Sequence, residues 1–359
     1  MLNVPLLPLY IAARYIFAVL LLIAASTALA DETSESKPPN PANEETTTGS
    51  VAQEEPSSPD ADPDEDDERW IDAGHDYAAQ KANEMTQWVD NFFGNDERDL
   101  EQAESRLRLR TIYNWDDRLD NEVKLRLGGK VSLPQISKRL DLVFRGEDMD
   151  DFSNEGVDDP SEDRIGLQYQ VGPRESQKHR FDLTVGFGSS GPKPGVKYVY
   201  QDAFAEDLNF RFTQRFTYDL GEGGYGTSRF VLDKALRERE LIRAYTKLLY
   251  GEKTDGTEWS SSLSYARGWQ GDGGRVGASW IYVGVDGQTE PYDFVKNYKV
   301  GLRLRRQAIR DFLFWEIEPS YNWRIDEPYF DREGAWRVEL RLEFLMFDNP
   351  AETVDRQFR

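Results

Sequence analysis

Apolar and polar residues alternate with a period of two along most of the chain from residue 104 onward. The first run, residues 106–115, places leucine and tyrosine on one face and arginine on the other. A period of two is that of a β-strand, whose successive side chains point to opposite sides of a sheet. In water the apolar face would cover a protein core, whereas in a bilayer it would meet lipid while the arginines line a polar interior.

The alternation predicts a series of strands, each about ten residues long, as in barrels that cross a membrane. The candidate strands cover residues 106–115, 120–133, 138–146, 164–172, 181–187, 196–200, 208–216, 227–235, 241–250, 257–267, 275–285, 298–304, 313–323 and 336–346. The weakest is 227–235, where only Phe230 and Leu232 mark the apolar face. For the run 275–285, the apolar set expected to face outward is Val276, Ala278, Trp280 and Tyr282.

A soluble β-sandwich alternates in the same way, so three other features have to separate the two folds. First, short connections (134–138, 204–206, 236–240, 307–311) alternate with longer ones (147–163, 286–293, 324–334), which is the asymmetry of membrane barrels. Second, aromatic residues near strand ends could form interfacial girdles. They are Trp115, Tyr250, Trp259, Tyr282, Trp323 and Trp336.

The third feature is the last strand, whose apolar alternation closes on the aromatic Phe347. In this pattern, residues 104–347 resemble bacterial outer-membrane β-barrel proteins. The resemblance is one of architecture and implies an all-β fold, an antiparallel transmembrane β-barrel of about 12–14 strands. It also implies export to the outer membrane of a Gram-negative bacterium. The alternative is a soluble periplasmic β-sandwich that acts as a binding module.

The N-terminal part has a different composition. Residues 1–30 carry an apolar run and end in small residues, which is typical of a cleavable signal peptide. Residues 31–69 are rich in Pro, Ser, Thr and acidic residues and predict a disordered acidic linker. At the other end, residues 348–359 are interpreted as a C-terminal tail.

Residues 70–94 predict one amphipathic helix, placed in the periplasm by the barrel interpretation. Gly94 is positioned to end it. Its docking face consists of Ala78, Ala82, Met85, Trp88, Val89 and Phe92. Three hosts remain open for this face: the mouth of the barrel, a membrane interface, or another periplasmic protein. The polar face is acidic, which argues against anionic lipid.

The net charge of -22 is unevenly distributed. Residues 1–103 carry 5 basic and 22 acidic side chains, and the remainder carries 39 basic and 44 acidic ones. The acidity therefore belongs mainly to the N-terminal part. The chain has no cysteine, which excludes disulfides, thiolate metal sites and cysteine nucleophiles. Its two histidines, His75 and His179, are not placed as catalytic bases, so we expect no enzymatic activity, no cofactor and no metal site.

If the apolar sets face lipid, residues of the opposite parity face the lumen. The basic ones are Arg106, Arg108, Arg110, Lys124, Arg126, Lys130, Arg139, Arg164, Arg180, Arg211, Arg215, Arg243, Lys247, Lys299, Arg303, Arg305, Arg337 and Arg341. The acidic ones are Asp141, Asp182, Glu316, Glu318, Glu339 and Glu343. Closing the barrel would bring Glu339 and Glu343 beside the arginines of the first strand.

Two functions fit this inner face. A water-filled pore with a basic lumen would favour small anionic solutes. Alternatively, ion pairs and the N-terminal helix would fill the lumen and leave a structural or docking barrel. In either case the expected partners are outer-membrane lipid and lipopolysaccharide, the barrel-insertion machinery and, through the helix, a periplasmic protein. No nucleic-acid partner is expected, because the basic residues would lie inside the barrel.

Overall fold

A computed structural model describes residues 105–346, apart from 134–135, 137–138, 146–163, 172–177, 189–190, 206, 222, 238, 255, 272–274, 311 and 326–329. The chain divides into two units, and all the described residues belong to the second unit, residues 76–359. The predicted signal peptide, linker, helix and C-terminal tail lie outside the described residues. Within the described residues, no helix is both long and apolar enough to span a membrane.

Fourteen strands follow one another in the described part of the chain. They are β1 (Ser105–Asp116), β2 (Glu122–Ser132), β3 (Leu140–Arg145), β4 (Arg164–Val171), β5 (His179–Gly188), β6 (Gly191–Ala205), β7 (Leu208–Asp219), β8 (Gly223–Arg237), β9 (Glu240–Gly251), β10 (Thr257–Gln270), β11 (Val276–Gln288), β12 (Phe294–Gln307), β13 (Leu313–Arg324) and β14 (Glu333–Met346). Each corresponds to one predicted run. The weakest of these runs is β8, which extends over 15 residues.

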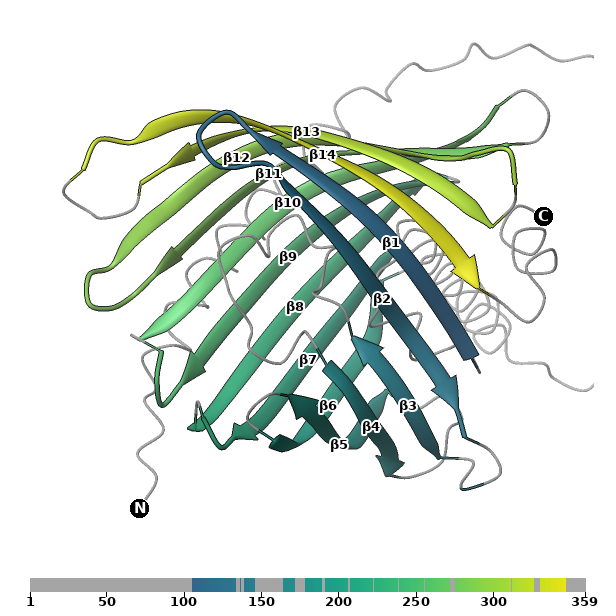
Figure 1. Cartoon of the computed structure of the whole chain (residues 1–359), viewed down its shortest axis with the longest axis vertical. Coiled ribbons are helices and arrows are strands. Elements are labelled where there is room, and N and C mark those ends of the chain that lie inside the picture. The colour runs from purple at the N-terminus through teal and green to yellow at the C-terminus, as the bar shows by residue number, and fades with distance from the viewer. Residues whose placement is uncertain are drawn as a thin grey trace, which may run out of the picture. The chain divides into compact units, whose positions relative to one another are not determined.

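Every strand pairs with its neighbours in sequence, and β14 pairs with β1 to close the ring (Figure 1). All pairs are antiparallel, with Arg110 opposite Glu343 at the closing seam. The predicted all-β barrel is therefore confirmed, at the upper end of the expected strand number, and the β-sandwich alternative is wrong. Because the number of strands is even, β1 begins and β14 ends at the same end of the barrel, which we call the terminal rim.

The two faces of the wall differ in chemistry. On β1 and β2 the residues that face outward are Leu109, Tyr113, Val123 and Leu125, of which Val123 and Leu125 are 68% and 70% exposed. On the other face of the same strands, Arg108 and Arg110 are buried. A ring of exposed large apolar side chains is unfavourable in water and is the surface that a transmembrane barrel presents to lipid.

Strand β11 reverses the expected orientation. Ile281 and Val283 face outward, 53% and 52% exposed, whereas the set expected outside is buried on the inner wall. That inward set comprises Val276, Ala278, Trp280 and Tyr282. The prediction for β11 was wrong because this strand is apolar on both faces, so alternation does not determine its orientation. The register does, since it sets Trp280 opposite Ala266 on β10 and Arg303 on β12.

Aromatic side chains gather on the outer face near both ends of the barrel. Near the end opposite the terminal rim, Tyr321 packs edge-on against Trp323 and Trp336, with ring centroids 4.6 and 5.1 Å apart. Near the terminal rim, His179 packs against Tyr200. Such belts mark the two membrane–water interfaces of transmembrane barrels. Tyr282 is not part of them, because its hydroxyl points inward and donates to Glu318 at 2.7 Å.

Candidate functional site on the inner wall

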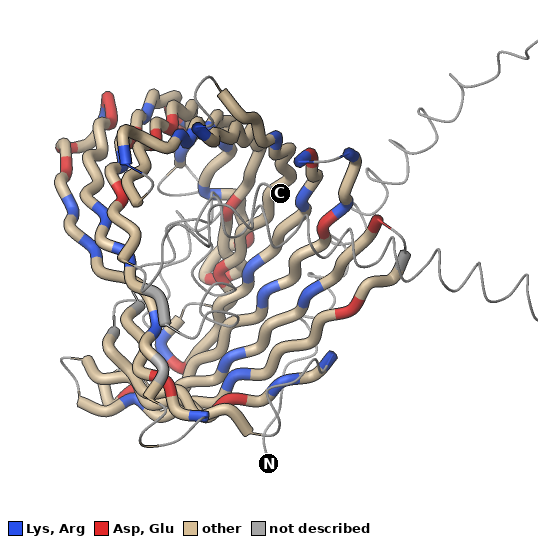
Figure 2. Tube along the Cα trace, turned by 90° about the vertical axis from the view of Figure 1, so that its right-hand side faces the viewer, with Lys and Arg blue, Asp and Glu red and all other residues tan. Residues whose placement is uncertain are grey.

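The candidate site is the charged inner wall, which is built by every second residue of the strands. Figure 2 shows lysine and arginine positions that lie side by side on neighbouring strands. Because cross-strand pairs in an antiparallel sheet have Cβ atoms about 5 Å apart, the register decides which of these charges meet. Two halves of the wall result, and they use their charges differently.

The first half carries a band of cations that we call the basic stripe. It consists of Lys197 on β6, Arg211 and Arg215 on β7, Arg229 on β8, and Lys247 on β9. Lys197 is directly opposite Arg215, and Arg229 is directly opposite Lys247. All five side chains are buried in the wall, and none is isolated.

Three carboxylates lie close to the basic stripe, and one of them, Asp182, is directly opposite Lys197. Asp233 receives two hydrogen bonds from Arg243, at 2.7 and 2.8 Å. Asp182 pairs with Arg180 at 2.8 Å, and Asp219 pairs with Lys193. The two pairs of facing cations concentrate positive potential on this side of the lumen. Like charges directly opposite each other also destabilise a sheet, so this arrangement costs the wall some stability.

The second half of the wall carries a network of ion pairs that we call the ion-pair lattice. It joins five arginines and four glutamates of β1, β12, β13 and β14: Arg110, Arg303, Arg305, Arg337, Arg341, Glu316, Glu318, Glu339 and Glu343. Arg303 and Arg341 each reach Glu318 at 2.8 Å, and Arg305 reaches Glu316 at 3.4 Å. Buried charges of this kind are stable only when each is paired, so the lattice is a structural element of the wall.

The seam of the barrel belongs to the ion-pair lattice. Arg110 of β1 pairs with Glu343 of β14, which also binds Arg305 of β12. Glu339 was expected to pair with the arginines of β1, but it lies opposite Asn114 and binds Arg337, at 3.1 Å, and Arg341 instead. The register explains the difference, because residue 339 is level with a position of β1 that has no cation.

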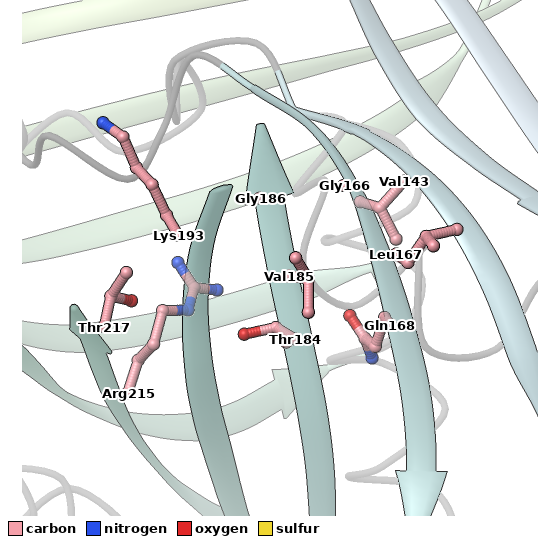
Figure 3. A pocket seen from close by; sticks show the side chains of 10 residues that line it. All are labelled: Val143, Gly166, Leu167, Gln168, Thr184, Val185, Gly186, Lys193, Arg215 and Thr217. Atoms are coloured by element: carbon pink, nitrogen blue, oxygen red, sulfur yellow. The ribbon is translucent and has the colours of Figure 1, made fainter. Parts of the chain in front are cut away.

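A shallow pocket opens on the inner wall between β3 and β7, next to the basic stripe (Figure 3). Arg215, Lys193, Thr184 and Gln168 line it together with glycines. Gly166 lies opposite Gly186, so β4 and β5 contribute no side chain at that level, where Val143 and Lys193 flank the two glycines. The pocket therefore offers cationic and hydroxyl groups beside a short stretch of bare backbone.

The remaining predicted site residues lie as follows. On the inner wall, Lys130 pairs with Asp141 at 3.5 Å, and Lys299 is buried. Lys124 and Arg126 are half-buried on β2, and Lys124 pairs with Glu122 at 2.8 Å. Arg139 is exposed in the turn before β3. Arg106 and Arg164 lie in β1 and β4, but their side chains are outside the described part, as is the predicted docking face of the helix.

Among the buried cations that the structure describes on the inner wall, three were missed by sequence reasoning: Lys193, Lys197 and Arg229. Strand β6 starts at Gly191 and includes Pro192 and Pro194. Because proline is unusual within strands, the first half of β6 was not predicted as a strand. Arg229 lies in β8, where few apolar residues mark the outer face. The signal for Lys197 was present, since it lies between the outward residues Val196 and Tyr198.

Among the described residues, no group of three or more histidines or acidic residues is placed to hold a metal ion. His179 lies on the outer face at the start of β5, with its Nδ1 atom 2.8 Å from the hydroxyl of Tyr198. In the adjoining turn, a hydrogen bond to Asp202 raises the pKa of Lys178 above its ordinary value. These groups form a polar edge to the aromatic belt at the terminal rim.

A closed ring of fourteen antiparallel strands, apolar outside and charged inside, is the architecture of outer-membrane β-barrel proteins, and the chain has this fold. No protein-family model and no curated protein sequence matches the chain.

Solved structures with a similar fold include three outer-membrane proteins. One is the outer-membrane expressed OmpT of Vibrio cholerae, with 10% identity and a TM-score of 0.40 over 67% of this chain and 97% of that one. The second is an anion-selective porin from Comamonas acidovorans, with 10% identity and a TM-score of 0.40 over 67% and 98%. The third is the KdgM porin in complex with disordered oligogalacturonate, with 8% identity and a TM-score of 0.33 over 67% and 99%. At these identities the likeness concerns the fold alone.

Proposed function

We propose that the protein is a pore in the outer membrane of a Gram-negative bacterium, and that its inner wall favours small anionic solutes. The observation that carries the proposal is the basic stripe, in which Lys197 meets Arg215 and Arg229 meets Lys247 in register. Rings or bands of arginine and lysine are the means by which pores prefer anions.

The contrast between the two halves of the wall supports this function. In the ion-pair lattice five arginines meet four glutamates, so most of the charge is compensated and the net field is small. On the stripe side the buried acids Asp182, Asp219 and Asp233 are outnumbered by the buried cations, so this side carries a net positive charge among the described residues. A charged groove with low-dielectric walls focuses the potential and raises the local concentration of counter-ions. An anion that passes through the lumen would therefore travel along one side of it.

We propose no catalytic step for this barrel. Nucleophilic hydrolysis needs a base within hydrogen-bond reach of a nucleophile. His179 instead contacts Tyr198 and packs against Tyr200, on the outer face of the wall. These tyrosines belong to the aromatic belt at the membrane interface, so the contacts of the His179 ring are structural.

A non-conducting structural or docking barrel is the second candidate. It is favoured by the depth of burial on the inner wall, since Lys247 and Arg303 are only 0% and 1% exposed. Side chains along a wide aqueous channel would retain more contact with water. Conductance measurements separate the two candidates.

Charge reversal on the basic stripe tests the pore directly. The double substitution R215E and R229E should weaken the anion preference, because it places a carboxylate opposite Lys197 and another opposite Lys247, so that both like-charge pairs become neutral. The measurement is the zero-current potential of reconstituted protein in a planar bilayer under a salt gradient, with folding verified by heat-modifiable migration. R118E is the matched control, because Arg118 is exposed in the connection after β1. Equal potentials for folded wild type and double variant would contradict the proposal.

A further inference from the structure

The inner wall carries an apolar cluster at the terminal rim, which the proposed function does not use. We call it the rim patch. It consists of Leu241, Ala266, Val276, Ala278, Phe314 and Leu345, from β9, β10, β11, β13 and β14. Their exposed fractions lie between 0% and 8%. Leu241, Val276 and Phe314 stand within the first two residues of their strands, so the rim patch lies at the mouth of the barrel.

The position of the rim patch is unusual for the wall of a water-filled lumen. Most inner positions of the same strands are polar, such as Ser260, Ser262 and Ser264 on β10. Apolar area on the inside of a barrel gains free energy only where another apolar surface covers it. The patch is therefore suited to an apolar partner that enters from the terminal rim.

We propose that residues 78–92 of this chain are that partner and dock on the rim patch as an amphipathic helix. The sequence places Ala78, Ala82, Met85, Val89 and Phe92 on one helical stripe. A helix of this length is about 22 Å long and about 10 Å wide. The stripe has small residues at one end and large ones at the other. It forms an apolar face that would pack against the apolar side chains of the rim patch.

Chain connectivity supports docking in cis. Strand β1 begins at the terminal rim, and residues 95–104 link it to Gly94, where the predicted helix ends. At about 3.4 Å per residue these ten or so residues span up to about 34 Å. Fourteen strands about 4.8 Å apart and tilted by about 40° form a barrel about 28 Å across. The link therefore reaches any point of the mouth.

Charge complementarity supports the same partner. The connections near the rim patch carry Arg239, Arg275 and Arg310, of which the last two are exposed. Inside the mouth, Arg305 lies over the ring of Phe314 at 4.7 Å, and Arg108 lies opposite Leu345. The segment that would approach these cations is acidic on its polar side and in its link to β1: Glu84, Asp90, Asp96, Glu97, Asp99 and Glu101. Attraction between them would orient the helix while the apolar stripe packs.

Disulfide cross-linking tests this docking, because the chain has no cysteine of its own. Pairs that join A82C, M85C or V89C to A278C would be oxidised in purified, reconstituted protein and separated by non-reducing electrophoresis. Since disulfides form only when the Cα atoms approach within about 7 Å, at least one pair should cross-link about fivefold above two controls. The first control joins Q87C, from the opposite side of the helix, to A278C. The second joins M85C to I281C, whose barrel residue faces outward.

Labelling with a water-soluble maleimide provides a second, independent readout in the full chain. A278C should react slowly, and the substitutions M85D and V89D should raise its rate by about tenfold, because they remove the apolar stripe that covers the patch. These substitutions lie outside the barrel and should leave its heat-modifiable migration unchanged. Equal labelling rates with and without them would overturn the proposal. So would protection of A278C in whole cells that is lost on purification, since the partner would then be a separate protein. Neither readout depends on whether the barrel conducts.

Discussion

Glu343 is the residue on which the closing seam depends. It is buried and binds Arg110 of β1 and Arg305 of β12, so it connects three strands of the ion-pair lattice. The sequence indicated that Glu343 would meet the arginines of β1, because the first and last strands of a barrel must pair. It did not indicate Arg305, which is brought in by the register of β12 with β13 and β14.

Neutralising this carboxylate should weaken the barrel. Removal of one partner from a buried ion pair leaves an uncompensated charge, so we expect E343Q to lower the free energy of unfolding by about 3–5 kcal/mol. Urea unfolding of the protein in lipid vesicles measures this quantity. Because R110Q together with E343Q removes both members of the seam pair, the double variant should lose less free energy of unfolding than the sum of the two single variants. Simple additivity would mean that the seam pair is not coupled.

At the scale of elements, the sequence predicted all fourteen strands, because large apolar residues at every second position have few other uses in a chain this rich in charge. The direction in which a strand faces was predicted wrongly only for β11, because both of its faces are apolar. Its inner face carries Trp280 and its outer face carries Val283. Burial and register depend on the neighbouring strands, which alternation within one strand does not encode.

The orientation of β11 can be tested with a charge on each face of the wall. Val283 lies midway along the strand and faces outward, so V283R should cost about 2–4 kcal/mol, the value for arginine at the midplane of the lipid face. T184R is the matched control, since Thr184 lines the pocket on the inner wall of β5. The free energy of folding into lipid vesicles is the measurement. If V283R is tolerated better than T184R, the two faces have been assigned the wrong way round.

At the scale of the whole molecule, the net charge is unevenly distributed along the chain. The N-terminal residues 1–103 carry most of the net negative charge, while cations gather in the basic stripe and at the terminal rim. The sequence predicted a basic lumen, but not its division into a largely compensated lattice and a cationic stripe. That division follows from which strands lie side by side. Lys193 and Arg229 were hidden in weakly alternating segments, whereas Lys197 was overlooked between Val196 and Tyr198.

We propose above all that this barrel conducts and that its basic stripe makes it prefer anions. The most direct test is the zero-current potential of the wild-type protein in a planar bilayer with a potassium chloride gradient, at low ionic strength so that charges in the wall are little screened. We expect a measurable conductance and a potential with the sign of the chloride equilibrium potential, which shrinks as salt is raised. A folded protein that gives no conductance, or a potential of the opposite sign, would contradict it.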